Sequence, residues 1–275
     1  MRQALHNARV LTPDGLIDGH VLLLRDDSIE ALVRDDDARL AQAHCVDLGG
    51  GVLVPGFIDV QVNGGGGALF NDAPTLDTIR RIGAAHARFG TTGFLPTLIS
   101  DDRAALRQAI AATQQAINVG VPGVLGVHIE GPWLNIARRG THDPATFRAL
   151  DEEDIAILGS LRGGRVLVTL APETTTPDIL HRLCAAGVIV FAGHTDASAA
   201  QMRQALADGV SGVTHLFNAM SPLTSREPGV VGVALDDSEC WCGIIVDGVH
   251  VDPTVLRIAL RAKSQRRFVL VTDAM

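Results

Sequence analysis

From about residue 52 onward, short apolar runs alternate with segments whose apolar residues recur every three or four positions. The runs are typical of buried parallel strands, and the spacing is typical of amphipathic helices that cover such strands. Repeated strand and helix units of this number predict an α/β fold, a (β/α)8 barrel of the TIM type. The expected strands lie at residues 52–60, 91–97, 124–130, 166–170, 188–191, 212–216, 243–246 and 268–271.

Residues 1–52 show a different pattern. Short apolar runs are separated by turn-forming residues such as Pro13, Asp14 and Gly15, which indicates short antiparallel strands. About fifty residues are too few for a well-buried domain, so we expect them to form the N-terminal part of a small β-sandwich domain that another segment completes. The predicted domains are therefore residues 1–52 and residues 53–275.

The last predicted strand ends close to Met275. A barrel of this type normally has a helix after its eighth strand. We therefore expect this sequence to be a fragment that lacks its C-terminal part.

Composition narrows the class of protein. The chain has 275 residues and a net charge of −8, without a basic cluster, which argues against nucleic acid or an anionic membrane as a partner. We find no apolar run long enough to span a bilayer and no apolar signal segment at the start. The four cysteines lack CxxC spacing and are predicted to be ordinary reduced thiols. These features predict a soluble cytoplasmic protein.

Polar residues that bind metals stand at the ends of several predicted strands. Glu130, His194 and His215 follow the third, fifth and sixth strands, and in such barrels the carboxyl ends of the strands converge on one face. The three side chains suit one divalent ion per subunit, Zn²⁺ above all but also Fe²⁺, Co²⁺ or Mn²⁺, and leave a position open for water. The alternative is that each is an ordinary polar residue at the barrel mouth.

Three further residues of the same face refine this hypothesis. Gln61 and Asn63 are two positions apart and face the same way; amides are poor ligands but good hydrogen-bonding partners for water or substrate, so we expect a single metal. Asp273, after the eighth strand, is the candidate general base. A base beside a metal predicts hydrolysis of an amide, an ester or a similar bond. Loops with Arg138, Arg139 and Arg226 suit an anionic group on the substrate.

Several motifs stand along the chain: PGFIDVQVNG at 55–64, HIEGPW at 128–133, AGH at 192–194, THLFNAM at 214–220, REPG at 226–229, DGVH at 247–250 and VTDAM at 271–275. Through these motifs the sequence resembles the N-acetylglucosamine-6-phosphate deacetylase family of the amidohydrolase superfamily.

The resemblance implies hydrolysis of the acetamide of N-acetylglucosamine 6-phosphate to glucosamine 6-phosphate and acetate. It implies that Glu130, His194 and His215 hold the metal and that Asp273 activates water and then protonates the amine. It further implies that His142 polarises the acetyl carbonyl and that Arg226 binds the phosphate of the neighbouring subunit's substrate in a homodimer. The remaining substrate contacts that it implies are Thr141, Asn218, Ala219 and His250.

Two alternatives stay open at this point. The substrate could be the galactosamine epimer, N-acetylgalactosamine 6-phosphate, because no motif separates the two sugars. The chain could also be a non-catalytic homologue that binds sugar phosphates, although a binding protein has no need of Asp273.

Overall fold

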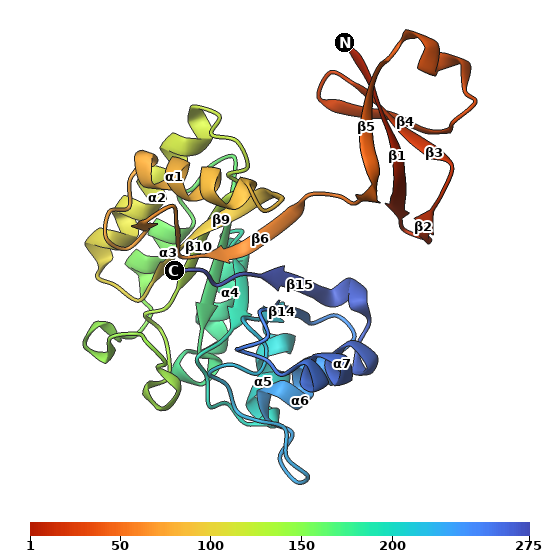
Figure 1. Cartoon of the computed structure of the whole chain (residues 1–275). Coiled ribbons are helices and arrows are strands. Elements are labelled where there is room, and N and C mark those ends of the chain that lie inside the picture. Colours follow the sequence, from red (N-terminus) through yellow and green to blue (C-terminus); the bar gives the residue numbers. More distant parts are fainter. The chain divides into compact units, whose positions relative to one another are not determined.

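The computed structural model describes residues 1–275, which divide into two compact units, Met1–Gly56 and Phe57–Met275. The first unit is a five-stranded sheet around β1, which pairs antiparallel with β2 and β3 and parallel with β5, while β4 pairs with β3 (Figure 1). Its small core consists of Ala4, Val21, Leu23 and Val33. The strands are β1 (Arg2–Thr12), β2 (Gly15–Ile17), β3 (His20–Arg25), β4 (Ser28–Arg34) and β5 (His44–Leu53), with a 3-10 turn at Ala38–Gln42.

The first barrel strand begins later than predicted. Val52 and Leu53 belong to β5, where they pair with Arg9 and Val10 of β1. The barrel strand β6 starts at Phe57. An apolar run reveals that a segment is buried but not which strand it pairs with, so the sequence merged two strands into one.

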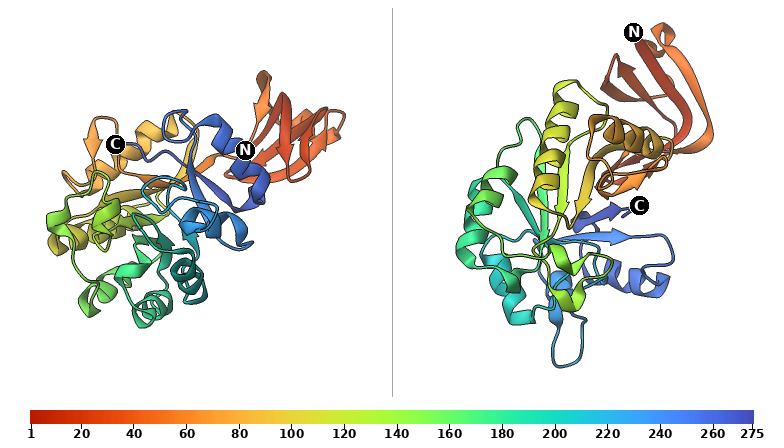
Figure 2. Two further views of the ribbon diagram at one scale, coloured as in Figure 1. Left: turned by 90° about the horizontal axis from the view of Figure 1, so that it is seen from below. Right: turned by 90° about the vertical axis from the view of Figure 1, so that its left-hand side faces the viewer.

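The second unit confirms the predicted barrel. Eight parallel strands follow one another in the order β6, β9, β10, β11, β12, β13, β14, β15, and the right-hand view of Figure 2 shows the helices around the outside of these strands. The strands are β6 (Phe57–Val62), β9 (Thr91–Ile99), β10 (Gly126–Glu130), β11 (Arg165–Leu170), β12 (Ile189–Ala192), β13 (Gly212–Val213), β14 (Trp241–Ile245) and β15 (Phe268–Val271), with a small hairpin of β7 (Gly64–Gly65) and β8 (Ala68–Leu69).

First and last strands meet where the barrel closes. Val62 bridges Ala274 in parallel fashion. The amide of Asp273 donates to the carbonyl of Gln61, and those of Asn63 and Gly64 donate to the carbonyl of Ala274, at 2.8–3.0 Å. We call this contact between the end of β6 and the end of β15 the seam.

Capping residues set the starts of most helices. Asp151, for example, begins α3 with a capping box to Asp154. Two helices were not predicted from the sequence pattern. One is α3, which is short, and the other is α6, whose GVVGVALD sequence resembles a buried strand. The helices are α1 (Leu76–Ala87), α2 (Arg103–Asn118), α3 (Glu152–Leu158), α4 (Pro177–Ala185), α5 (Ala199–Ala207), α6 (Gly229–Asp236) and α7 (Pro253–Ala262). Short 3-10 turns lie at Ile136–Arg138, Pro144–Thr146, Pro172–Thr174 and Gln265–Arg267.

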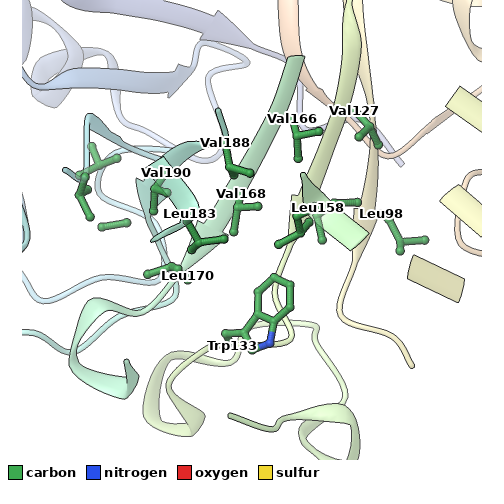
Figure 3. Packing of buried hydrophobic residues seen from close by; sticks show 14 of the residues in the cluster. Leu98, Val127, Trp133, Leu158, Val166, Val168, Leu170, Leu183, Val188 and Val190 are labelled. Carbon is green, nitrogen blue, oxygen red and sulfur yellow. The ribbon is translucent and has the colours of Figure 1, made fainter. Parts of the chain in front are cut away.

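The side chains of the barrel strands alternate between two packed regions. Outward residues such as Val127, Val166 and Val168 pack with Leu158 of α3 and Leu183 of α4 (Figure 3). Inside the barrel, Leu95, Leu167 and Phe191 pack with Val60 and Trp241 and fill the interior. His128 and Glu130 share a face of β10 and lie fully buried. No helix of the protein has the length and apolar character that a bilayer span requires.

Candidate active site

Three chemically active side chains lie just after strand ends, in an unusual backbone conformation. His194, His215 and Asp273 have φ angles of 49°, 35° and 51°. This left-handed region is sparsely populated by residues other than glycine, and such residues cluster at functional sites. The chain therefore turns sharply after β12, β13 and β15 at the positions that the strand-end prediction singled out.

Glu130, His194 and His215 converge on one point. Oε1 of Glu130 lies 3.1 Å from Nε2 of His194 and 3.0 Å from Nε2 of His215, and the two Nε2 atoms are 3.1 Å apart. All three residues are buried. These are the candidate metal ligands that the sequence predicted, and the structure brings them together.

The hydrogen bonds of His194 indicate that this cluster fits a cation. Nδ1 of His194 lies 2.8 Å from the carbonyl oxygen of Arg138, which can only accept, so Nδ1 carries the proton and a neutral ring presents a lone pair at Nε2. That lone pair faces the carboxylate of Glu130 and the second imidazole. A lone pair placed there can bind a cation, and two imidazoles with a carboxylate are a donor set that Zn²⁺ and similar ions accept.

Electrostatics around Glu130 keep it ionised. Burial alone would raise the pKa of Glu130, but the two imidazoles that contact it together hold that pKa well below its ordinary value. By contrast, burial lowers the pKa of His128, two residues earlier, to about 4, so His128 is neutral. His128 bonds to the hydroxyl of Thr169 at 2.7 Å.

Asp273 lies beside this cluster and is held by two amides. Its Oδ1 accepts from Nε2 of Gln61 at 3.1 Å and from Nδ2 of Asn63 at 2.7 Å. The same Gln61 nitrogen lies 3.2 Å from both oxygens of Glu130. Burial raises the pKa of Asp273, and the negative charge of Glu130 adds to this rise. Gln61 thus contacts both carboxylates and Asn63 contacts Asp273. The side-chain carbonyl oxygens of these two amides have no hydrogen-bond partner.

His142 lies next to the cluster, against His194. Its Nδ1 lies 2.6 Å from Oγ of Ser100 and 3.3 Å from the backbone amide of Ser100, which can only donate. Nδ1 is therefore the acceptor, and the ring proton sits on Nε2. Burial lowers the pKa of His142 to about 4, so the ring is neutral and its Nε2–H is available to a carbonyl oxygen. The rings of His142 and His194 meet edge to face at 4.3 Å between centroids.

A cavity of about 420 Å³ opens onto these groups. Gln61 lies buried beside the two carboxylates and is not part of its lining. Arg226 is also not part of the lining and is exposed, in the loop between β13 and α6. The other ten predicted site residues all line the cavity: Asn63, Glu130, Thr141, His142, His194, His215, Asn218, Ala219, His250 and Asp273.

Several contacts that orient site residues were not predicted from the sequence. The carbonyl of Arg138 orients His194, Ser100 orients His142, and the carboxylate of Asp247 lies 2.7 Å from Nδ1 of His250. Ser100 directly follows β9, so the rule of searching strand ends could have found it. A backbone carbonyl such as that of Arg138 leaves no sequence signal.

Comparison with known proteins agrees with this geometry. The sequence profile of the Amidohydrolase family matches residues 52–272. The chain belongs to the amidohydrolase family. This family is metal-dependent, and the candidate triad of Glu130, His194 and His215 gives the chain a potential metal site.

Individual relatives show which members of the family the chain is similar to. The chain is 45% identical over 269 residues to an N-acetylgalactosamine-6-phosphate deacetylase of Shewanella sp., covering 98% of this chain and 68% of the relative. It is 34% identical to the N-acetylglucosamine-6-phosphate deacetylase of Haemophilus influenzae, covering all of this chain and 72% of the relative. The predicted resemblance to this group of deacetylases is confirmed.

Solved structures extend the similarity to the fold. The N-acetylglucosamine-6-phosphate deacetylase of Pasteurella multocida superposes with a TM-score of 0.94 at 33% identity, over all of this chain and 72% of that one. A mutant of the Mycobacterium smegmatis enzyme in complex with N-acetyl-D-glucosamine-6-phosphate gives a TM-score of 0.88 at 34% identity, over all of this chain and 71% of that one.

Proposed function

We propose that this protein hydrolyses the acetamide of N-acetyl-D-glucosamine 6-phosphate to D-glucosamine 6-phosphate and acetate. The observation that carries the proposal is that the triad of Glu130, His194 and His215 lines the same cavity as Asp273. Relatives named as amino-sugar phosphate deacetylases support the substrate class.

The residues divide the reaction among them. Glu130, His194 and His215 would hold one divalent ion, and the chemistry such an ion supplies is Lewis acidity, which polarises a carbonyl and makes water a better nucleophile. Asp273 takes a proton from water as the water oxygen bonds to the acetyl carbon. The Nε2–H of His142 donates to the acetyl oxygen. Asp273 then gives its proton to the amine nitrogen as the C–N bond breaks, so that acetate and the free amine leave.

Substrate contacts follow from the cavity lining. Thr141, Asn218, Ala219 and His250 would contact the sugar phosphate, and Asn63 would act near the water and the acetyl group. Gln61, which does not line the cavity, would act there through the two carboxylates that it contacts. Neither Arg nor Lys is among the residues that line the cavity, while Arg226 is exposed on its own loop. This supports a homodimer in which Arg226 of one subunit binds the phosphate in the other subunit's cavity.

We further propose zinc as the metal, with iron, cobalt or manganese as alternatives, because the same ligands accept all four. The four cysteines are all free, which supports a reducing compartment, the cytoplasm. We also propose that the barrel, whose first strand starts at Phe57, carries the chemistry and that the sheet before it forms part of a small β domain.

A second substrate is favoured by one observation. The Shewanella relative, 45% identical, is named for the galactosamine epimer. The two sugars differ in the configuration of one hydroxyl group, so the same machinery would act on N-acetylgalactosamine 6-phosphate.

Acetate release from three compounds tests the proposal. The purified protein is given N-acetylglucosamine 6-phosphate, N-acetylgalactosamine 6-phosphate and unphosphorylated N-acetylglucosamine. We expect release from one or both phosphorylated sugars and almost none from the third. Release from the unphosphorylated sugar at an equal rate would contradict the role of the phosphate, and metal-loaded protein that releases acetate from none would contradict the activity.

A further inference from the structure

Asp59 is a buried carboxylate to which the proposed chemistry gives no role. It lies on β6 with 4% of its surface exposed. No lysine, arginine or histidine forms an ion pair with it. Burying a carboxylate without a cation is costly, and hydrogen bonds are the means by which a fold offsets that cost. The identity of its donors is therefore informative.

All donors to Asp59 come from the two strands that form the seam. Its Oδ2 accepts from Oγ1 of Thr272 at 2.6 Å and from the Thr272 amide at 3.2 Å. Its Oδ1 accepts from the Gln61 amide at 3.1 Å. One carboxylate thus joins the backbone of β6 to the residue that immediately precedes Asp273.

Both of these donor residues are also directly connected to Asp273. Thr272 is its neighbour in the chain. Gln61 accepts the Asp273 amide at its carbonyl, at 3.0 Å, and donates to the Asp273 carboxylate from its side chain. Asp59 consequently holds the backbone of Thr272, which precedes the base, and the backbone of Gln61, which bonds to the amide of the base. It does not contact the base or line the active-site cavity.

We propose that Asp59 is a positioning residue that aims Asp273, by holding Thr272 and Gln61 so that the left-handed turn at Asp273 is maintained. The proposal rests on the proposed function, because it takes Asp273 to be the base. A non-glycine residue at φ 51° keeps that conformation only when its surroundings impose it. If the Asp59 contacts are lost, the turn relaxes and the base moves relative to the acetyl group.

The alternative role for Asp59 is barrel closure alone, and a matched control separates the two roles. Thr97 of β9 holds β6 from its other side: its Oγ1 accepts from the Val62 amide at 2.8 Å, and the residue is fully buried. Thr272→Val and Thr97→Val each remove one hydroxyl that bonds to the Asp59 carboxylate or to the backbone of β6, although Thr272 is exposed and Thr97 is buried. Only the first lies beside Asp273.

The experiment compares Asp59→Asn, Thr272→Val, Thr272→Ser, Thr97→Val and Asp273→Asn for kcat, KM, bound metal and thermal stability. We expect Asp59→Asn and Thr272→Val to lower kcat about 10- to 100-fold, the range for a group displaced by about an ångström. KM and bound metal should stay within about twofold, since neither residue touches the cavity or a metal ligand. Thr272→Ser keeps the hydroxyl and should restore kcat, while Thr97→Val should lose stability with kcat unchanged.

A measurement without substrate gives an independent reading. Amide hydrogen exchange should accelerate at Asp273, Asn63 and Gly64, the donors across the seam, in Thr272→Val but not in Thr97→Val. Equal exchange in both variants, or a kcat that falls equally in both, would mean that Asp59 only closes the barrel.

Failures of the two proposals are distinguishable. An Asp273→Asn protein that keeps full activity would refute the base and with it the proposed function. An inactive Asp273→Asn beside a fully active Thr272→Val would refute only the positioning role of Asp59.

Discussion

The two sides of the active site differ in how their hydrogen-bonding groups are balanced. At the triad of Glu130, His194 and His215, three buried groups meet within 3.0–3.1 Å, and His194 directs a lone pair at the other two. At the seam, one carboxylate oxygen of Asp273 accepts from two amide donors of the protein itself. We therefore expect a cation to bind at the triad, whereas the protein's own hydrogen bonds hold the seam. Substitutions at the triad should lower the amount of bound metal, and substitutions at the seam should lower kcat.

Asp273→Asn should separate the two sides with the largest effect on rate. The amide cannot take a proton from water, so kcat should fall about 10²- to 10⁴-fold, the range for loss of a general base. Bound metal should stay near the wild-type amount because Asp273 does not contact the triad atoms. Metal analysis and acetate release on the same sample check this, with Asp72→Asn, an exposed residue on the surface, as the control. Loss of metal together with rate would contradict the division.

Glu130→Gln should break the triad. The charged acceptor shared by both imidazoles is removed, so the affinity for a divalent ion should fall by at least about 100-fold, more than is typical for loss of a group outside the ligand set. Competition with a chelator measures the affinity. Activity should return only at high added metal. Unchanged affinity would mean that Glu130 is not a ligand.

Asn63→Leu tests how the seam sets the pKa of Asp273. Its amide favours the ionised form of Asp273, so its loss raises the pKa of Asp273 further. The base acts only when deprotonated, hence activity disappears as the pH falls through that pKa, and the acid limb of the kcat/KM profile should move to higher pH. At neutral pH we expect roughly a tenfold loss, in line with one hydrogen bond to a charged group. Asn118→Leu on the surface of α2 makes the same change elsewhere and should leave the profile in place.

Ser100→Ala should have the smallest effect. It removes the hydroxyl that fixes the tautomer of His142 but keeps the backbone donor, so kcat should fall about fivefold, the equivalent of one neutral hydrogen bond. Nitrogen chemical shifts of the ring report the tautomer directly. Ser160→Ala, at the end of α3, is the matched control. A fully active Ser100→Ala with a mixed tautomer would remove His142 from the mechanism.

The two sides also differ in how far the sequence could predict them. The barrel and the triad follow from a general rule, because side chains after parallel strands converge, and Glu130 and His215 needed only that rule. The seam depends on which strands pair, and the sequence placed the start of β6 too early, at Val52 rather than Phe57. The chemistry of amides assigned Gln61 and Asn63 to water or substrate, and the structure adds Asp273 as a group that both of them contact.

A second limit is chemical. Asp59 lies inside a recognisable motif. The sequence alone does not show that its carboxylate accepts a hydrogen bond from Thr272, more than two hundred positions away. Long-range hydrogen bonds of this kind require coordinates. The same holds for α6, whose apolar sequence fits a strand and becomes a helix only through its packing.

The most direct test of the central claim is a metal titration of the metal-free protein. Zn²⁺ is added in steps while bound metal and acetate release from N-acetylglucosamine 6-phosphate are followed together. The account predicts that both saturate at about one ion per chain, since one triad holds one ion and the seam needs none. Full activity in the metal-free protein, or activity that appears only with a second equivalent, would contradict it.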